Sequence, residues 1–158
     1  MSPRAALRLE TLGFENVYDY VAGKAEWLAN GLPREGRTAD VLYAGQAVDA
    51  DPPTCSLDTP LDEIRATLEN ARFGFCLVLG AGRVVLGSVR RSALDRADPS
   101  ATADSLMAPG PSTARFDTPA ETLVKRLARR RLATAVISRP NGSLVGVFSR
   151  ADVEQQLH

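Results

Sequence analysis

The chain has 158 residues and a mass of 16.9 kDa, and its 44% hydrophobic and 24% charged content is typical of a soluble globular protein, not of a disordered chain, collagen or a disulfide scaffold. Nineteen basic residues balance nineteen acidic ones, so no net field attracts nucleic acid or a membrane surface. One histidine and two cysteines exclude a zinc site, a Cys-His dyad and the usual Ser-His-Asp triad.

Residues 1–36 form an N-terminal segment. The pattern of its apolar residues predicts a helix over 5–12, a strand over 16–20 and a second helix over 23–29. These elements are too small to enclose a core. The segment therefore docks on another surface or is partly disordered. We adopt docking, because its apolar side chains, Trp27 among them, are costly to leave in water.

The chain contains no apolar run of the roughly 18 residues that a membrane span needs, and its first residues lack the apolar stretch of a signal peptide. We therefore expect a cytoplasmic location without membrane contact. In that compartment Cys55 and Cys76 are expected to be reduced thiols in the core.

A unit of about 60 residues occurs twice after the N-terminal segment. The tripeptide Asp-Thr-Pro stands at 58–60 and again at 117–119, a separation of 59 residues. At the same offset, apolar residues align with apolar residues and glycine aligns with glycine. The aligned pairs are Ile64 with Leu123, Leu68 with Leu127, 76–78 with 135–137, and Gly87 with Gly146. We divide the chain into an extension (1–36), a first unit (37–100) and a second unit (101–158).

Both units predict the order strand, helix, strand, strand, helix, which is an α+β fold. Each first helix starts at Thr-Pro with an acid two residues after the proline, which predicts a capping box with threonine at the N-cap. The strands are expected at 54–57, 75–79 and 83–89, then at 113–116, 133–138 and 143–148. A three-stranded sheet of this size cannot cover both of its faces, so we expect the units to pack sheet to sheet with pseudo-two-fold symmetry.

The second unit ends in the sequence Gly-Val-Phe-Ser-Arg-Ala-Asp at 146–152. With the repeat length, the Asp-Thr-Pro helix start and the apolar strand before a glycine turn, this ending makes residues 38–158 resemble a tandem pair of cystathionine-β-synthase (CBS) domains, or Bateman module. The resemblance implies a non-catalytic regulatory unit whose cleft binds an adenosine compound.

A second resemblance concerns the N-terminal segment, where residues 9–18 and 31–36 are similar to the C-terminal end of a rhodanese domain. The active-site loop of that family, with its cysteine nucleophile, has no counterpart here. A remnant or complementing sulfurtransferase is thus an alternative that the missing loop disfavours, and we expect no enzymatic activity.

The CBS resemblance implies a ligand site in the second unit. Asp152 has the carboxylate that accepts two hydrogen bonds from a ribose diol, and Ser149 begins the last helix, where a phosphate is favoured. Ser-x-x-Asp at a helix start is also an imperfect capping box, which needs no ligand. By family analogy four more residues flank the adenine: Thr113, Ala133, Thr134 and Ala135.

The first unit departs from this pattern, because Arg90 stands at the position of Ser149 and Ala93 at the position of Asp152. Its cleft lacks the ribose acceptor, so one ligand per chain is expected. Arg90 is a candidate phosphate contact, and the alternative is a solvated arginine on the surface.

The sequence therefore predicts a sensor of an adenosine compound, with AMP, ADP, ATP, NAD and S-adenosylmethionine all open, and with no metal and no obligatory cofactor. We expect ligand occupancy to be passed on by a change of shape or association, in a homodimer or to an unidentified effector protein. The alternatives are a purely structural dimerisation module with an empty cleft and, for the basic helix around 125–131, nucleic-acid binding, which we do not adopt.

Overall fold

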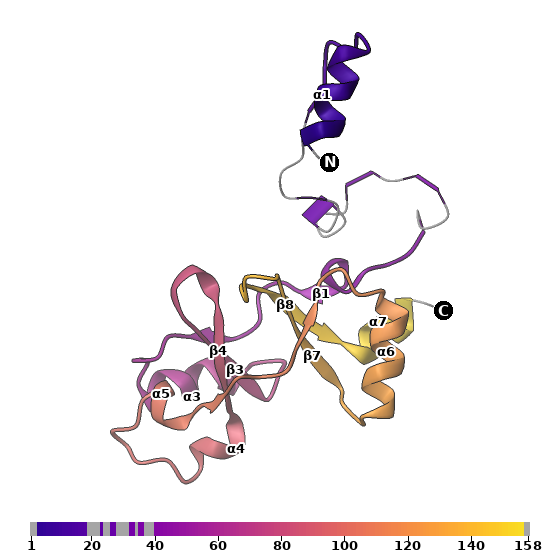
Figure 1. Cartoon of the computed structure of the whole chain (residues 1–158). Coiled ribbons are helices and arrows are strands. Elements are labelled where there is room, and N and C mark those ends of the chain that lie inside the picture. The colour runs from indigo at the N-terminus through magenta and orange to yellow at the C-terminus, as the bar shows by residue number, and fades with distance from the viewer. Residues whose placement is uncertain are drawn as a thin grey trace.

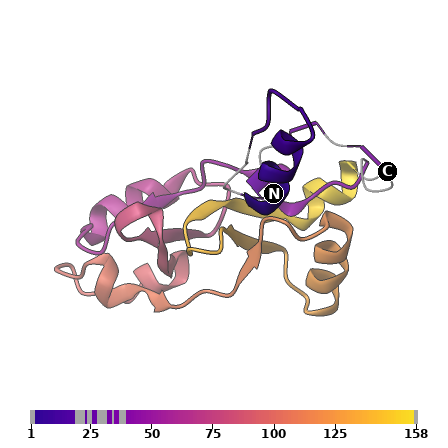
Figure 2. The same cartoon turned by 45° about the horizontal axis from the view of Figure 1, so that its top comes forward.

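The computed structural model describes residues 3–18, 23, 26–27, 32–33, 35–36 and 40–156 (Figure 1). Its main body consists of the two repeated units, each built around one four-stranded sheet. Figure 2 shows them side by side, the first mostly in purple to pink and the second mostly in orange to yellow. Among the described residues, no helix is long and apolar enough to cross a membrane.

The first repeat has its strands in the order β2-β3-β4-β5, with β2 parallel to β3 and the other pairs antiparallel. Its elements are β2 (Thr54–Cys55), α3 (Leu61–Glu69), β3 (Phe75–Leu79), the 3₁₀ turn η2 (Ala81–Arg83), β4 (Val85–Arg90), α4 (Arg91–Leu94), α5 (Ala103–Leu106) and β5 (Ala108–Pro109).

The second repeat has the strand order β1-β8-β7-β6, again with one parallel pair, β6 with β7. Its elements are the 3₁₀ turn η1 (Ala44–Gln46), β1 (Val48–Asp49), β6 (Thr113–Arg115), α6 (Ala120–Arg129), β7 (Thr134–Ser138), β8 (Leu144–Ser149) and α7 (Arg150–Gln156). The predicted order of strand, helix, strand, strand, helix is confirmed in both repeats.

The fourth strand of each sheet comes from the chain ahead of the other repeat, which corrects the expectation of three-stranded sheets. Strand β1 lies near the start of the first sequence unit (37–100) but pairs with β8 of the second, where Val48 lies opposite Phe148. Strand β5 lies near the start of the second sequence unit (101–158) but pairs with β4 of the first, where Ala108 lies opposite Ser88. In Figure 1 the purple β1 accordingly lies beside the yellow β8.

This exchange explains why the predicted capping boxes at the starts of α3 and α6 are wrong. The N-cap residues are Pro60 and Pro119, and neither helix has a side-chain cap. The first N–H groups instead donate to the exchanged segments, from Leu61 to the carbonyl of Ala101 at 3.0 Å and from Ala120 to the carbonyl of Leu42 at 2.8 Å. Backbone acceptors therefore replace the threonine hydroxyls.

The core has three clusters, one inside each repeat and one between them. The cluster between the repeats combines Phe73 and Leu77 of the first with Val136, Leu144 and Val147 of the second, all buried. A backbone hydrogen bond of 3.1 Å from Val85 to Gly142 adds to this contact. The sheets thus pack face to face, as predicted.

The two cysteines lie on the adjacent strands β2 and β3 as free thiols, with Cys76 buried and Cys55 half-buried. The side-chain hydrogen bond with Cys76 lowers the pKa of the Cys55 thiol, against the effect of its partial burial. The same hydrogen bond and burial raise the pKa of the Cys76 thiol. Cys55 is therefore the more readily ionised of the two.

Helix α1 (Pro3–Thr11) projects from the repeats, and the chain leaves it at Gly13, whose φ of 92° ends the helix as predicted (Figure 1). Residues 16–18 form no strand, so the predicted strand is wrong there, and 19–20 lie outside the described residues together with most of the expected second helix.

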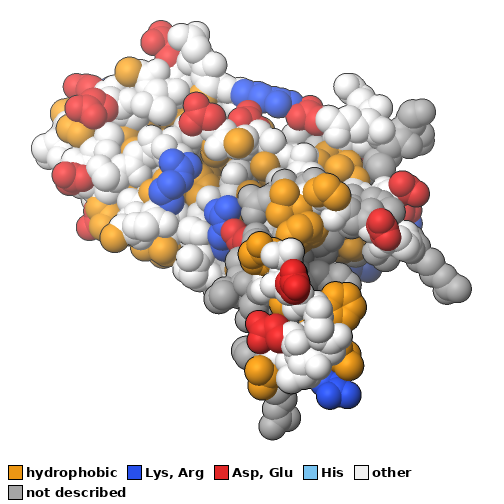
Figure 3. All heavy atoms as spheres, turned by 90° about the horizontal axis from the view of Figure 1, so that it is seen from above, with side chains coloured by type: hydrophobic (Ala, Val, Ile, Leu, Met, Phe, Trp, Pro, Cys, Tyr) orange, Lys and Arg blue, Asp and Glu red, His pale blue; other side chains and the backbone are white. Residues whose placement is uncertain are grey.

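The N-terminal segment contacts the second repeat through Glu26, which forms an ion pair of 3.2 Å with Arg139, as the predicted docking requires. Large apolar side chains nearer the N-terminus are exposed to solvent instead, as Figure 3 shows in a view onto this segment. These side chains are Leu7, Leu12, Phe14 and Tyr18, which are 58 to 79% exposed. Within the part of the chain that the structure describes, no apolar partner buries these side chains, so the predicted docking does not extend to them.

Candidate functional site

A cavity of about 490 Å³ lies between the two repeats. This volume is within the range of small-molecule sites. The first repeat contributes residues of β3, β4 and β5, the second contributes the loop before β7 and the first residues of β7, and the chain just after β5 completes the lining. The lining residues are Phe75, Leu77, Ser88, Arg90, Ala108, Pro109, Pro111, Ser112, Arg131, Leu132, Ala133, Thr134, Ala135 and Val136.

The walls of the cavity are apolar because they continue the core between the repeats. Leu77 and Val136 are buried members of that core, and Phe75 packs against it. The ring of Phe75 stacks on the ring of Phe73 with 5.7 Å between centroids. Ala133 and Ala135 line the same cavity with small side chains at the start of β7.

The polar groups of the cavity are hydroxyls and guanidinium groups. Three hydroxyls line it, on Ser88, Ser112 and Thr134, and its charged lining residues are Arg90 and Arg131. Neither arginine forms an ion pair or a side-chain hydrogen bond within the described part of the chain, and no carboxylate is among the lining residues. The cavity is therefore apolar inside and positively charged.

A smaller hollow of about 280 Å³ adjoins the cavity between β6 and α6. Thr113, Arg126 and Arg130 line it, and it shares a wall with the cavity at Thr134 and Ala135. This hollow, too, has no acidic lining residue.

The structure brings five of the seven predicted site residues to these two hollows. Arg90 lines the cavity together with the predicted stretch 133–135. Thr113 lines the smaller hollow, and its strand β6 runs parallel to β7, with Thr113 opposite Val136.

Ser149 and Asp152 lie outside the lining of both hollows. Ser149 ends β8, where it pairs with Thr134 of β7. Asp152 lies on α7 and accepts a hydrogen bond from Arg72 of the first repeat, with which it forms an ion pair. The guanidinium carbon of Arg72 lies 5.5 Å from the centroid of the Phe73 ring. The carboxylate predicted to bind ribose is thus held by a cation of the other repeat.

Arg72 and Arg131 were missed by the site prediction, although the sequence contained a signal for them. They lie 59 residues apart, the offset of the repeat, and each precedes the second strand of its unit. Arg72 also lines an open hollow of about 420 Å³ with Phe73 and Thr54. The two arginines therefore occupy equivalent places next to two different clefts.

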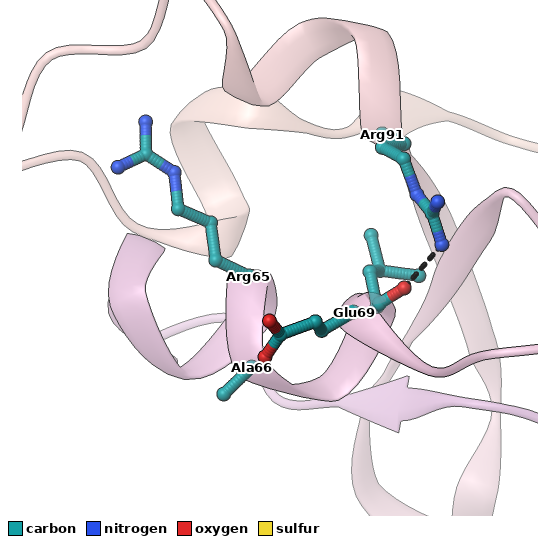
Figure 4. A pocket seen from close by; sticks show the side chains of 5 residues that line it. Arg65, Ala66, Glu69 and Arg91 are labelled. Carbon is teal, nitrogen blue, oxygen red and sulfur yellow. Dashed lines mark hydrogen bonds between the residues drawn. The ribbon is translucent and has the colours of Figure 1, made fainter.

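A further hollow of about 450 Å³ lies between α3 and α4 (Figure 4), and its arginines have structural partners. Arg91 donates a hydrogen bond to the carbonyl of Leu68, and Arg65 donates one of 2.9 Å to the carbonyl of Leu94. Both guanidinium groups satisfy carbonyls near helix ends. Arg91, the sequence neighbour of Arg90, is thus engaged in joining two helices.

Comparison with known proteins adds the family. The model of the CBS domain matches residues 44–100 and 103–158, and no curated protein matched the sequence.

Three solved structures with the same fold have 13 to 20% sequence identity to this chain. The cytosolic domain of the Mg²⁺ channel MgtE in complex with ATP has a TM-score of 0.63 at 20% identity, over 75% of this chain and 50% of that one. The protein CBSX2 in complex with AMP has a TM-score of 0.62 at 16% identity, over 73% and 95%, and another structure of CBSX2 is described as coming from Arabidopsis thaliana. A CBS domain pair in complex with 5′-methylthioadenosine and S-adenosyl-L-methionine has a TM-score of 0.61 at 13% identity, over 74% and 96%.

This chain thus spans half the length of the channel domain and nearly all of the two other structures. The two family matches cover more than half of the chain and fall within the two sequence units 37–100 and 101–158. The chain belongs to the CBS domain family.

Proposed function

We propose that this protein is a regulatory module that binds an adenosine-containing ligand in the cavity between its repeats. The observation that carries the proposal is that both repeats line one cavity with an apolar interior. A ligand in it contacts both repeats and favours one arrangement of them over others, which is a population shift. The ligands of the structural neighbours, ATP, AMP and S-adenosylmethionine, support this class of ligand.

In this proposal the adenine lies between Phe75 and the small residues Ala133 and Ala135, with Thr134 and Thr113 at its edge. Arg90 is proposed to contact the phosphate. Ser149 and Asp152 line neither hollow, and Asp152 can accept a ribose diol only if it releases Arg72. We therefore propose the cavity as the primary site, with one ligand per chain.

Titration calorimetry and thermal shift with adenosine, AMP, ADP, ATP, NAD and S-adenosylmethionine test this function. At a ligand concentration one hundred times Kd, we expect a gain of about 2.7 kcal/mol, or a rise of roughly 5 to 10 °C in Tm. Ala133→Trp should weaken binding about tenfold or more, because the indole ring would fill part of the cavity that Ala133 lines. The fold should tolerate this change, because Ala133 is an exposed residue.

Ala128→Trp is the matched control, because Ala128 is exposed on α6 and lines neither hollow. It should bind like the wild type. Binding that Ala133→Trp leaves unchanged, or two equivalent sites per chain, would contradict the assignment.

We also propose that the module is not an enzyme. A nucleophilic cysteine is activated in an electropositive place such as a helix N-terminus. Cys55 and Cys76 belong to strands β2 and β3 instead. The cytoplasmic location predicted from the sequence is retained as part of this proposal.

A second candidate function is association, and the exposed apolar residues of the N-terminal segment favour it. We propose that Leu7, Leu12, Phe14 and Tyr18 are covered by a second copy of the chain, with an unidentified effector protein as the other candidate partner. Light scattering should give twice the monomer mass of 16.9 kDa. The double variant Leu7→Ser, Phe14→Ser should shift the protein to monomer. A wild-type monomer at micromolar concentration would contradict the homodimer.

A further inference from the structure

We propose that Arg90 and Arg131 form an anion-binding site in the cavity, so that its ligand carries phosphate groups and is not a neutral or cationic adenosyl compound. The inference names the ligand class of the site described above, and only its adenosine part rests on the proposed function.

The lining of the cavity is positively charged. Its charged lining residues are two arginines, and no described side chain neutralises either of them. A guanidinium group keeps its charge and has five N–H donors in a planar arrangement that matches two phosphate oxygens. The adjoining hollow adds Arg126 and Arg130, which strengthens the positive potential at the shared wall.

The backbone of Arg131 has a left-handed conformation. It has a φ of 57° just after α6, where the N–H of Leu132 bonds to the carbonyl of Leu127 at 2.9 Å and the N–H of Arg131 to that of Ala128 at 3.0 Å. In this helix ending the left-handed residue is usually glycine, because a Cβ is crowded there. An arginine at this place has an unfavourable backbone and no partner for its side chain in the described fold, and a bound anion supplies one.

The two repeats differ at the position whose side chain pairs with the arginine. Arg131 is equivalent to Arg72, and Ala93 is equivalent to Asp152, because each pair lies 59 residues apart. Arg72 has its charge neutralised by Asp152. Ala93 has no acceptor, so Arg131 lacks the carboxylate that its counterpart has. Arg90 replaces Ser149 in the same repeat and adds a second positive charge.

The consequence is that the two clefts differ in charge. The cavity has the cations Arg90 and Arg131, whereas the α7 side has the ion pair of Arg72 and Asp152. An anionic ligand is attracted to the cavity, whereas on the α7 side Arg72 and Asp152 neutralise each other.

Calorimetry on the full chain tests the inference with four probes: adenosine, S-adenosylmethionine, ADP and pyrophosphate. ADP should bind at least about tenfold more tightly than adenosine or S-adenosylmethionine, and pyrophosphate should bind measurably without any base. In Arg131→Gly, ADP affinity should fall about ten- to a hundredfold while adenosine affinity is unchanged. Tm should be equal to that of the wild type or higher, because glycine suits the left-handed backbone.

Arg129→Gln is the matched control, because Arg129 is exposed on α6 and lines neither hollow, and its ADP affinity should equal that of the wild type. If adenosine binds as tightly as ADP, or if Arg131→Gly binds ADP like the wild type, the anion site is refuted while the adenosine function stands. If pyrophosphate binds as tightly as ADP and adenosine does not bind, the anion site stands and the adenosine function is refuted. If none of the four probes binds, both are refuted.

Discussion

Replacing Gly146 with alanine is expected to destabilise the protein by about 3 kcal/mol and to lower Tm by roughly 6 to 12 °C. A Cβ at this position lies 2.3 Å from the carbonyl oxygen of Asp49 and 2.8 Å from the side chain of Val48. The oxygen belongs to the backbone of β1 and cannot rotate away, so β1 has to move from β8. Thermal unfolding followed by circular dichroism measures the effect.

Gly74→Ala is the control for this prediction. A Cβ there meets no atom within 4 Å, and the φ of Gly74 is not in the left-handed region. The variant should unfold within about 0.5 kcal/mol of the wild type. Equal losses in the two variants would show that β1 does not press against Gly146.

Phe148→Ala is expected to cost about 3 to 5 kcal/mol, a large part of the stability of an ordinary domain. The ring is fully buried in the core of the second repeat, where Phe116 and Val153 are members of the same cluster. The residue lies in β8 between Val48 of β1 and Ala135 of β7. Losing the ring leaves a cavity where both neighbouring strands meet, so chemical denaturation should show a much lower midpoint.

Phe14→Ala is the matched control, since the same side chain is 60% exposed in the N-terminal segment. Its effect should stay within about 0.5 kcal/mol at a concentration where the chain is monomeric. A loss as large as that of Phe148→Ala would show that Phe14 packs against the repeats after all.

The sequence predicted most of the fold because the repeat is preserved in its apolar runs. The strand expected at 75–79 has those bounds in the structure, and the one expected at 133–138 begins a single residue later. The match of Gly87 with Gly146 was also visible, but its cause was not. Each glycine lies beside a strand from the chain ahead of the other repeat, and a repeat pattern gives no information on which sheet such a strand joins.

The candidate site was harder to predict for a related reason. The alignment of the repeats pairs residue with residue, but it does not show which parts of the two units face each other. Ala133 and Thr134 were therefore grouped with Asp152, whereas the structure places them next to Arg90 of the other repeat. The left-handed backbone of Arg131 had no signal either, since the position usually held by glycine has an arginine here.

The crossed strands also restrict how the two halves can move. The peptide between β1 and β2 has four residues, two of them Pro52 and Pro53, and the peptide between β5 and β6 has three, with Pro111 in the middle. Such short, stiff tethers are not long enough for the wide hinge opening of a clamshell. A small sliding shear is the motion that tethers of this length still allow. Because Pro111 and Ser112 line the cavity, a ligand in the proposed site would contact one of the two tethers, and we expect it to shift both halves together.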